Sequence, residues 1–203
     1  MSGRWGKAVG VLALLGATVG SSLDAIHTHT GTTQYAHPLF FRMAWWVPPE
    51  FALAAVAIGL ARPLWERFLL RQTLSPPAWS VALGMGMFVL AYALSGILPF
   101  DWTTRSLVLV AIFGAVWAIC DRTALGVFLA GSTALLGTST EIALVRLDLF
   151  SYLHPNLSVV AGWLPWLYAT AAIAVGNLGK RLVDADDPVP LEPVSEGTPT
   201  SPP

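Results

Sequence analysis

The stretch Val175-Gly176-Asn177-Leu178-Gly179-Lys180-Arg181-Leu182 closes a hydrophobic segment that begins near Trp163-Leu164-Pro165. Small residues and an asparagine at the end of an apolar run let a helix pack closely against its neighbours. The two cations that follow at once are typical of a helix end that leaves the membrane on the cytoplasmic side. The stretch therefore predicts the end of a transmembrane helix in a tightly packed bundle.

The composition of the whole chain indicates the same class of protein. Of the 203 residues, 55% are hydrophobic and 11% are charged, and the mean hydropathy is +0.63. A soluble globular domain carries about 25% charged residues. We therefore interpret the chain as an all-α integral membrane protein. Its single cysteine, Cys120, allows no internal disulfide.

Six apolar segments each have about the 20 residues that a helix needs to cross about 30 Å of hydrocarbon. They form a predicted transmembrane domain over residues 1–182 and lie at residues 7–26, 46–64, 78–98, 103–120, 124–145 and 161–180. The first segment could also be a signal peptide, since Arg4 and Lys7 begin it. Asp24 follows it without a clear small-x-small cleavage site, so we expect a retained helix.

The cations predict the orientation of these six segments. Eight of the eleven lysines and arginines fall on one side of a six-span arrangement: Arg4, Lys7, Arg62, Arg67, Arg71, Arg122, Lys180 and Arg181. Because cytoplasmic loops carry an excess of Lys and Arg, both termini are predicted to be cytoplasmic. The nine tryptophans fall near the two expected boundaries, where amphipathic indoles are enriched.

Residues 183–203 form a tail of different composition. They contain six prolines together with acidic residues, Ser and Thr. Such a segment cannot bury enough apolar surface to offset the entropy of ordering, so we expect a disordered, Pro-rich acidic tail. A solvated tail without function and a tail that recruits a partner are the two interpretations left open.

Four motifs in residues 40–182 resemble the Insig (insulin-induced gene) family of sterol-responsive membrane proteins. They are Trp45-Trp46-Val47-Pro48-Pro49 followed by Ile58-Gly59-Leu60 and Pro63, then Trp117 with Asp121-Arg122, then Pro155 with Trp163-Leu164-Pro165, and finally Gly176-Asn177-Leu178-Gly179. The resemblance implies a six-helix bundle that binds a lipid. The chain departs from eukaryotic members in its shorter N-terminus and its single cysteine, and a bacterial member would fit this composition. The usual protein partners, Scap and HMG-CoA reductase, then need not exist, and the ligand need not be a sterol.

Glu141 is the charged residue expected inside the fifth segment, about midway along it. An ionised carboxylate facing lipid at that depth costs at least ~2.5 kcal/mol, so Glu141 should face the bundle or a cavity. Gly137 and Thr138 share its helix face at spacings of four and three. We treat Gly137, Thr138 and Glu141 as candidate ligand-binding residues. A buried hydrogen bond between helices is the alternative.

Two further candidates come from the resemblance. Trp117 matches a family position beside the sterol site, and a core or boundary aromatic is the alternative. Asp121 matches a family aspartate that is associated with partner binding. A local surface ion pair between Asp121 and Arg122 would be worth less than ~1 kcal/mol, which leaves an interfacial topology signal as the alternative.

The sequence offers little sign of metal, cofactor or catalytic chemistry. His27, His29, His37 and Glu50 lie in or beside one predicted loop, where we expect solvated side chains and no metal site. The chain has no Gly-rich phosphate loop, no Gly-x-Ser-x-Gly and no second carboxylate near Glu141 in sequence. We therefore expect no cofactor and no enzymatic activity. A basic face for nucleic acid is also missing.

Small residues suggest where a ligand would fit. Gly16 and Gly20 have the spacing that lets helices approach closely, and Gly84, Gly86, Gly126 and Gly176 add further small faces. Packing within the bundle and a homo-oligomer interface are both open. Small faces also leave room for a lipid-sized cavity.

The sequence thus predicts a multi-pass protein of the plasma membrane if bacterial, or of the endoplasmic reticulum if eukaryotic. We expect it to hold a sterol-like or acylglycerol-like lipid as a sensor or regulatory module, with another membrane protein as a further expected partner. A small transporter or channel with a polar path around Glu141 is the alternative.

Overall fold

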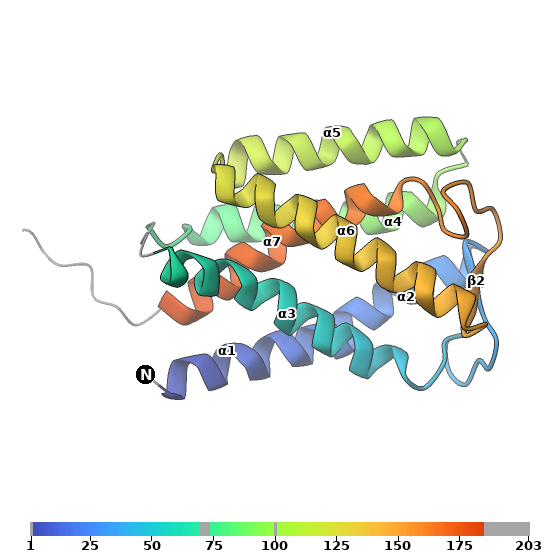
Figure 1. Cartoon of the computed structure of the whole chain (residues 1–203), viewed down its shortest axis with the longest axis horizontal. Helices are drawn as coiled ribbons and strands as arrows, with labels where there is room; N and C mark the ends of the chain where they lie inside the picture. The colour runs from blue at the N-terminus through green and yellow to red at the C-terminus, as the bar shows by residue number, and fades with distance from the viewer. Residues whose placement is uncertain (1, 70–73, 100, 185–203) are drawn as a thin grey trace, which may run out of the picture.

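Long helices run lengthwise beside one another through the molecule (Figure 1). The computed structural model describes residues 2–69, 74–99 and 101–184. Its elements are α1 (Ser2–Leu15), a π-helical turn η1 (Gly16–Gly20), α2 (Ser21–His29), β1 (Thr33–Tyr35), α3 (Val47–Phe68), α4 (Ala78–Ile97), α5 (Trp102–Cys120), α6 (Ala124–Arg146), β2 (Phe150–Tyr152) and α7 (Leu164–Asp184). Because α1, η1 and α2 follow one another without a break, they count as one helix. The predicted all-α bundle of six helices is confirmed.

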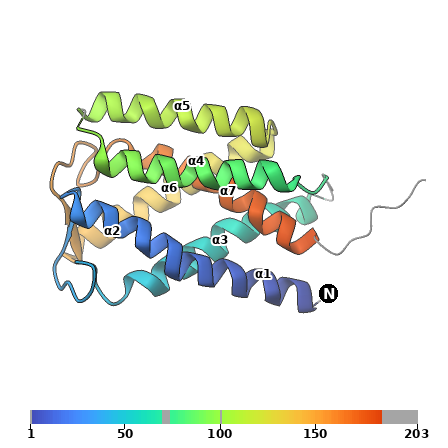
Figure 2. The same ribbon diagram turned by 180° about the vertical axis from the view of Figure 1, so that it is seen from behind.

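Five of the six helices are long and apolar enough to cross a membrane, and α7 is the sixth. Helix α7 is buried along most of its length and packs against α1, α3, α4, α5 and α6. Figures 1 and 2 show it enclosed between the other helices. A helix surrounded by other helices packs closely through small side chains, whereas a helix that faces lipid can carry large apolar ones. This explains the run Ala169-Thr170-Ala171-Ala172 in α7.

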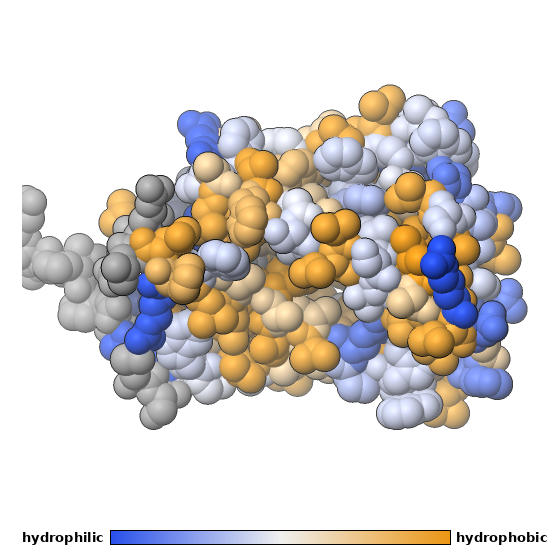
Figure 3. All heavy atoms as spheres, viewed as in Figure 1, coloured by the Kyte–Doolittle hydropathy of each residue, from blue (hydrophilic) through white to orange (hydrophobic). Residues whose placement is uncertain are grey.

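The outer surface of the bundle suits a lipid environment. Large apolar side chains such as Leu53, Leu107 and Leu135 are exposed on α3, α5 and α6. In Figure 3 the bluest spheres lie toward the two ends of the molecule, and apolar side chains cover much of the length between them. This distribution is the one expected of a multi-pass integral membrane protein, because exposed leucines favour hydrocarbon over water.

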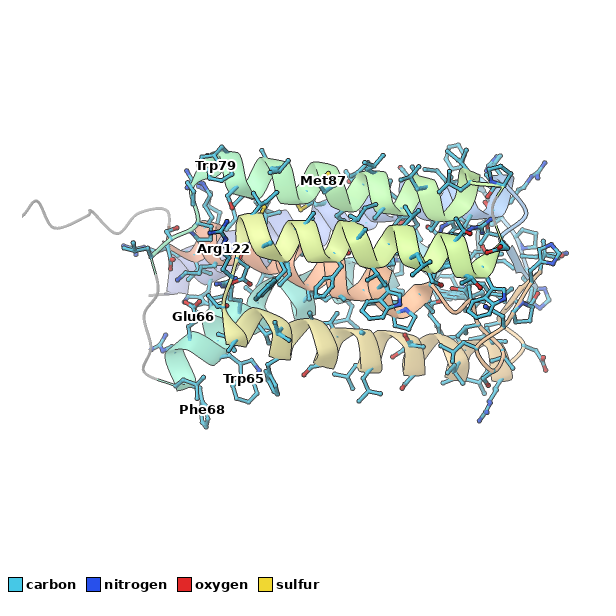
Figure 4. The ribbon with its side chains drawn as sticks, turned by 90° about the horizontal axis from the view of Figure 1, so that it is seen from above. Trp65, Glu66, Phe68, Trp79, Met87 and Arg122 are labelled. Carbon is cyan, nitrogen blue, oxygen red and sulfur yellow. The ribbon has the colours of Figure 1, made fainter. Side chains whose placement is uncertain are left out.

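The bundle has two distinct ends. The terminal end is the one where α1 begins and α7 finishes, and Figure 4 shows Trp65, Glu66, Trp79 and Arg122 there. The strand end is the opposite one, which carries β1 and β2 (Figure 1). With the N-terminus and the end of α7 on one side, an even number of spans follows. That this side is cytoplasmic remains a prediction from the cations.

Glycines set the closest helix contacts. A Cβ added to Gly179 would lie 1.8 Å from the backbone oxygen of Gly59, and one added to Gly16 would lie 2.2 Å from that of Phe51. Backbones therefore touch where α7 meets α3 and where η1 meets α3. Gly179, one of the small residues in the stretch 175–182, therefore has a packing role within the bundle.

Two features differ from the sequence prediction. The strands β1 and β2 pair antiparallel, with Thr33 opposite Tyr152 and Tyr35 opposite Phe150, although no strand was expected. Helix α7 continues to Asp184, so Val183 and Asp184, which were assigned to the tail, are helical. The remaining tail, residues 185–203, lies outside the described residues.

Candidate functional site

A cavity of about 140 Å³ lies between the N-terminal helix, α3, α4 and α7. Its lining is largely apolar and includes Leu12, Leu23, Phe51, Ile58, Phe88 and Val175. The turn η1 contributes Gly16, Val19 and Gly20, so the irregular part of the N-terminal helix faces the cavity. Single-turn π-helical insertions are frequent at functional sites.

The cavity has an opening between η1 and α4. Val19 of η1 and Val89 of α4 both line it and are 42% and 37% exposed. Helix α2 packs on α4, whereas α1 packs on α3 and α7. Figure 2 shows α1 diverging from α4 toward the terminal end. The opening therefore faces sideways, toward the lipid around the bundle.

Polar side chains from several helices close the strand end of the cavity. Glu50 of α3, Tyr92 of α4, Glu141 of α6 and Tyr168 of α7 all line it. The Glu141 carboxylate accepts a hydrogen bond from Tyr168 Oη at 2.7 Å and another from the Tyr152 hydroxyl. Among the described residues, no group donates a hydrogen bond to the Glu50 carboxylate. The site thus offers an apolar body with a polar, acidic end.

A smaller cavity of about 40 Å³ adjoins this acidic end. It shares Glu50, Tyr92, Glu141 and Tyr168 with the larger cavity. It is also lined by Asp24, whose Oδ2 accepts a hydrogen bond from Tyr35 Oη at 2.8 Å. Three residues with carboxylate side chains, Asp24, Glu50 and Glu141, therefore line these adjoining cavities. We call these three residues the acidic cluster.

The paired strands place two of the tyrosine donors. In each strand the first and third residues are buried and the middle one is exposed, so Tyr35 and Tyr152 point inward. Burial raises the pKa of both tyrosines above the ordinary value, with the nearby Asp24 and Glu141 charges adding to the shift. Both hydroxyls therefore stay protonated and donate to carboxylates.

The structure places the predicted ligand-binding residues in different surroundings. Glu141 lines both cavities, although it lies in the last two turns of α6 and not midway. Gly137 packs on Tyr168, since a Cβ added there would lie 2.5 Å from the tyrosine ring. Thr138 is buried, and its hydroxyl has no hydrogen-bond partner among the described residues. Neither Thr138 nor Trp117 lines the two cavities described above.

Trp117 and Asp121 lie together at the terminal end, far from Glu141 along the bundle. The Trp117 indole donates to the backbone oxygen of Thr123 at 3.2 Å. Asp121 does not pair locally with Arg122. Its carboxylate accepts from Arg62 Nη1 at 2.8 Å and from Thr123 Oγ1 at 2.6 Å, and its side chain is fully buried.

Arg62 is the centre of a larger charge network, which consists of Arg62, Glu66, Asp121, Lys180 and Asp184. Arg62 Nε lies 3.1 Å from Glu66 Oε1, and Lys180 Nζ lies 2.7 Å from Glu66 Oε2. Lys180 also pairs with Asp184 at 2.9 Å. Asn177 joins the network by accepting from Arg62 Nη1 at 2.6 Å. The sequence prediction missed the network: the links from Arg62 to Asp121 and from Lys180 to Glu66 join residues far apart along the chain, although Arg62–Glu66 and Lys180–Asp184 are only four residues apart.

The expectation of solvated loop histidines is wrong for His27. His27 lies in α2, is 3% exposed, and its Nε2 is 2.9 Å from Ser95 Oγ. Its ring stacks on Tyr92 with the centroids 4.7 Å apart. The α2 helix runs three residues beyond the predicted segment, which carries His27 into the bundle. Within the described ranges, no group of three His, Cys, Asp or Glu side chains is arranged to hold a metal ion.

Comparison with known proteins identifies relatives along most of the chain. No family model matches it. The insulin-induced gene 1 protein of Danio rerio is 29% identical over 177 residues, which cover 85% of this chain and 70% of that protein. The human insulin-induced gene 1 protein is 28% identical over 191 residues, or 92% of this chain and 68% of the relative.

A solved structure with the same fold is that of MvINS, a mycobacterial Insig homologue from Mycobacterium vanbaalenii. It superposes with a TM-score of 0.78 and 25% sequence identity, covering 90% of this chain and 97% of that chain. A cysteine variant of MvINS has also been crystallised as a cross-linked trimer, with the same TM-score. The resemblance carried by the four sequence motifs is thereby confirmed in sequence and in fold.

Proposed function

The chain belongs to the insulin-induced gene (Insig) family, and on that premise we propose that it binds a weakly polar lipid as a membrane sensor or regulatory module. The observation that carries the proposal is the cavity of about 140 Å³ whose apolar body ends on Glu50, Glu141 and Tyr168. Ligand sites are typically apolar pockets with a few polar groups that orient the ligand. A sterol-like or acylglycerol-like lipid has the matching shape, with a long apolar body and a small head.

The cavity volume limits how much of the lipid it encloses. An engineered cavity of about 150 Å³ holds a molecule the size of benzene. The enclosed space of about 140 Å³ therefore suits the head region and its first carbons. The rest of the lipid would extend through the opening between Val19 and Val89 into the bilayer. A lipid held in this way can enter and leave sideways, which is what a sensor of membrane composition requires.

The distribution of polar groups supports binding over transport. A transporter or channel needs polar groups along a path across the membrane. Here the described lining is apolar over most of its length, and its carboxylates gather at the strand end. The charge network at the terminal end is committed to internal ion pairs. These features also favour a binding protein over an enzyme.

We extend the proposal to assembly and location. MvINS is similar over nearly its whole length, and a cross-linked cysteine variant of it has been crystallised as a trimer. Both findings support a bacterial, plasma-membrane protein that forms homo-oligomers. A partner site at Asp121 stays a prediction. In this structure the carboxylate is buried against Arg62, so a partner would contact the surrounding helix ends and not the carboxylate itself.

A tryptophan placed at the opening tests lipid binding. Val89→Trp should fill the entrance, whereas Leu90→Trp is the matched control, because Leu90 is equally exposed on the same helix and does not line the cavity. We expect Val89→Trp to lower the lipid that co-purifies in mild detergent by about tenfold, the effect of losing ~1.4 kcal/mol of binding. Mass spectrometry of the extracted lipid gives the occupancy. Equal occupancy in the parent and both variants would contradict the proposal.

A further inference from the structure

The acidic cluster is assembled from three different helices. Asp24 comes from α2, Glu50 from α3 and Glu141 from α6, and all three line the cavity of about 40 Å³. Glu50 and Glu141 also line the larger cavity. Carboxylates at a membrane-embedded site are costly, and they are normally paired with cations or with strong hydrogen-bond donors. The nature of their partners therefore indicates what the site binds.

Within the described ranges, hydroxyl groups donate to two of the three carboxylates, and no cation pairs with any of the three. Tyr35 donates to Asp24, and Tyr152 and Tyr168 donate to Glu141. No lysine or arginine is among the described residues that line either cavity. Neutral hydroxyls stabilise a carboxylate but leave its charge uncompensated.

Arg105 and His27, two basic side chains near the strand end, have partners outside the acidic cluster. Arg105 donates to the backbone oxygens of Ser95 and Leu98. His27 is held by Ser95 and by stacking on Tyr92. Arg42 lines an adjoining pocket of about 300 Å³ on the outer surface, and none of the three carboxylates of the acidic cluster lines that pocket. No cation therefore lines the cavities of the acidic cluster, as far as the described part of the chain is concerned.

A second observation at the same place is a buried hydroxyl without a partner. Thr33 is only 4% exposed, and its hydroxyl has no hydrogen-bond partner among the described residues. It lines the small cavity beside Asp24 and Glu50. Thr33 and Tyr35 also line the outer pocket, so this end of the site adjoins the aqueous surface. A buried hydroxyl without a partner costs free energy, which a donor or acceptor placed in the cavity would recover.

We propose that the acidic cluster binds a protonated primary amine carried by an amphiphile. This inference rests on the proposed lipid-binding function, since the apolar tail occupies the larger cavity. An ammonium group carries the compensating charge and three donors, enough for Glu50, Glu141 and the Thr33 hydroxyl. An alcohol head has one donor and no charge. A bare metal ion fits poorly, because the described acidic and histidine side chains do not converge on a common point.

Matched amphiphiles test the inference directly. Binding of dodecylamine, dodecanol and ethylamine to the full chain is measured by calorimetry in non-ionic detergent at neutral pH. Because hydrogen bonds to charged groups are stronger than those between neutral groups, dodecylamine should bind at least about tenfold more tightly than dodecanol. Ethylamine separates the head from the tail: tight binding of ethylamine would support the amine site and identify a small free amine as its ligand.

Two variants and a control test which residues bind the amine. Glu50→Gln and Thr33→Val should each weaken dodecylamine binding and leave dodecanol binding unchanged. Asp148→Asn is the control, because Asp148 is exposed at the same end and its φ of 57° suits asparagine. Equal binding of dodecanol and dodecylamine to the parent would overturn the amine inference and leave the lipid cavity standing. Saturable binding of neither amphiphile would overturn both proposals.

Discussion

The two ends of the bundle bury carboxylates in opposite ways. At the terminal end, Glu66 and Asp121 each have a cation within 3.1 Å, because Arg62 and Lys180 reach them from α3 and α7. At the strand end, the carboxylates of Asp24 and Glu141 meet only tyrosine hydroxyls, and Glu50 meets no described donor. A buried carboxylate that is paired with a cation of the same chain contributes to the stability of the fold. A carboxylate that lacks a cation, or any hydrogen-bond donor, remains able to bind a ligand.

The terminal end should therefore be sensitive to the loss of one charge. Arg62→Met would leave Asp121 and part of Glu66 buried without their cation. We expect the free energy of unfolding to fall by about 3–5 kcal/mol, the cost of breaking a buried ion pair on one side only. Thermal unfolding in detergent measures it. Arg122→Met is the control, since Arg122 is exposed at the same end; similar losses in both variants would show that the network does not hold the end together.

The stability and the lipid occupancy of the strand end should also be sensitive to overpacking. Gly137→Ala would bring a Cβ to 2.5 Å from the Tyr168 ring and push that ring away from Glu141. We expect a loss of about 1–3 kcal/mol in unfolding free energy, as for other overpacked sites, together with lower lipid occupancy. Gly131→Ala lies on the same helix and would meet open space. If Gly137→Ala kept the parent's stability and lipid content, Tyr168 would not be a fixed part of the site.

Glu50→Gln should have the smallest effect on the unfolding free energy. Glu50→Gln removes a carboxylate that no described group holds, so the unfolding free energy should change by less than about 0.5 kcal/mol or rise slightly. The same thermal unfolding assay applies. A loss as large as that of Arg62→Met would mean that Glu50 belongs to the fold and not to a binding site.

Hydrophobic runs and glycine positions made much of the fold predictable. Each run of about 20 apolar residues became a helix, and Gly176-Asn177-Leu178-Gly179 did mark a helix packed closely in the bundle. The short strands were not predictable, because the three-residue alternations Thr33-Gln34-Tyr35 and Phe150-Ser151-Tyr152 are too brief to stand out. They pair across 114 intervening residues, whose fold brings β2 back to β1.

The candidate site was predictable only in part. Glu141 stood out, since a single carboxylate in an apolar run must face protein or a cavity. Glu50 and His27 did not, because they were expected in or beside a loop with solvated side chains, although Glu50 lies within the predicted segment 46–64. The end of α2 and the start of α3 carry both residues into the bundle. Thr33 could not be recognised at all, because an unpartnered hydroxyl is defined only by its surroundings.

Local composition, spacing and motifs along the chain were enough to predict the class of protein, its six helices and its resemblance to the Insig family. Which charged side chains pair with one another could not be predicted in this way, because it depends on how the helices pack. Arg62 and Asp121 lie 59 residues apart and form an ion pair, whereas Asp24, Glu50 and Glu141 line one small cavity whose described lining holds no lysine or arginine. Pairing depends on distance in space over a few ångströms, and the helix packing alone sets that distance.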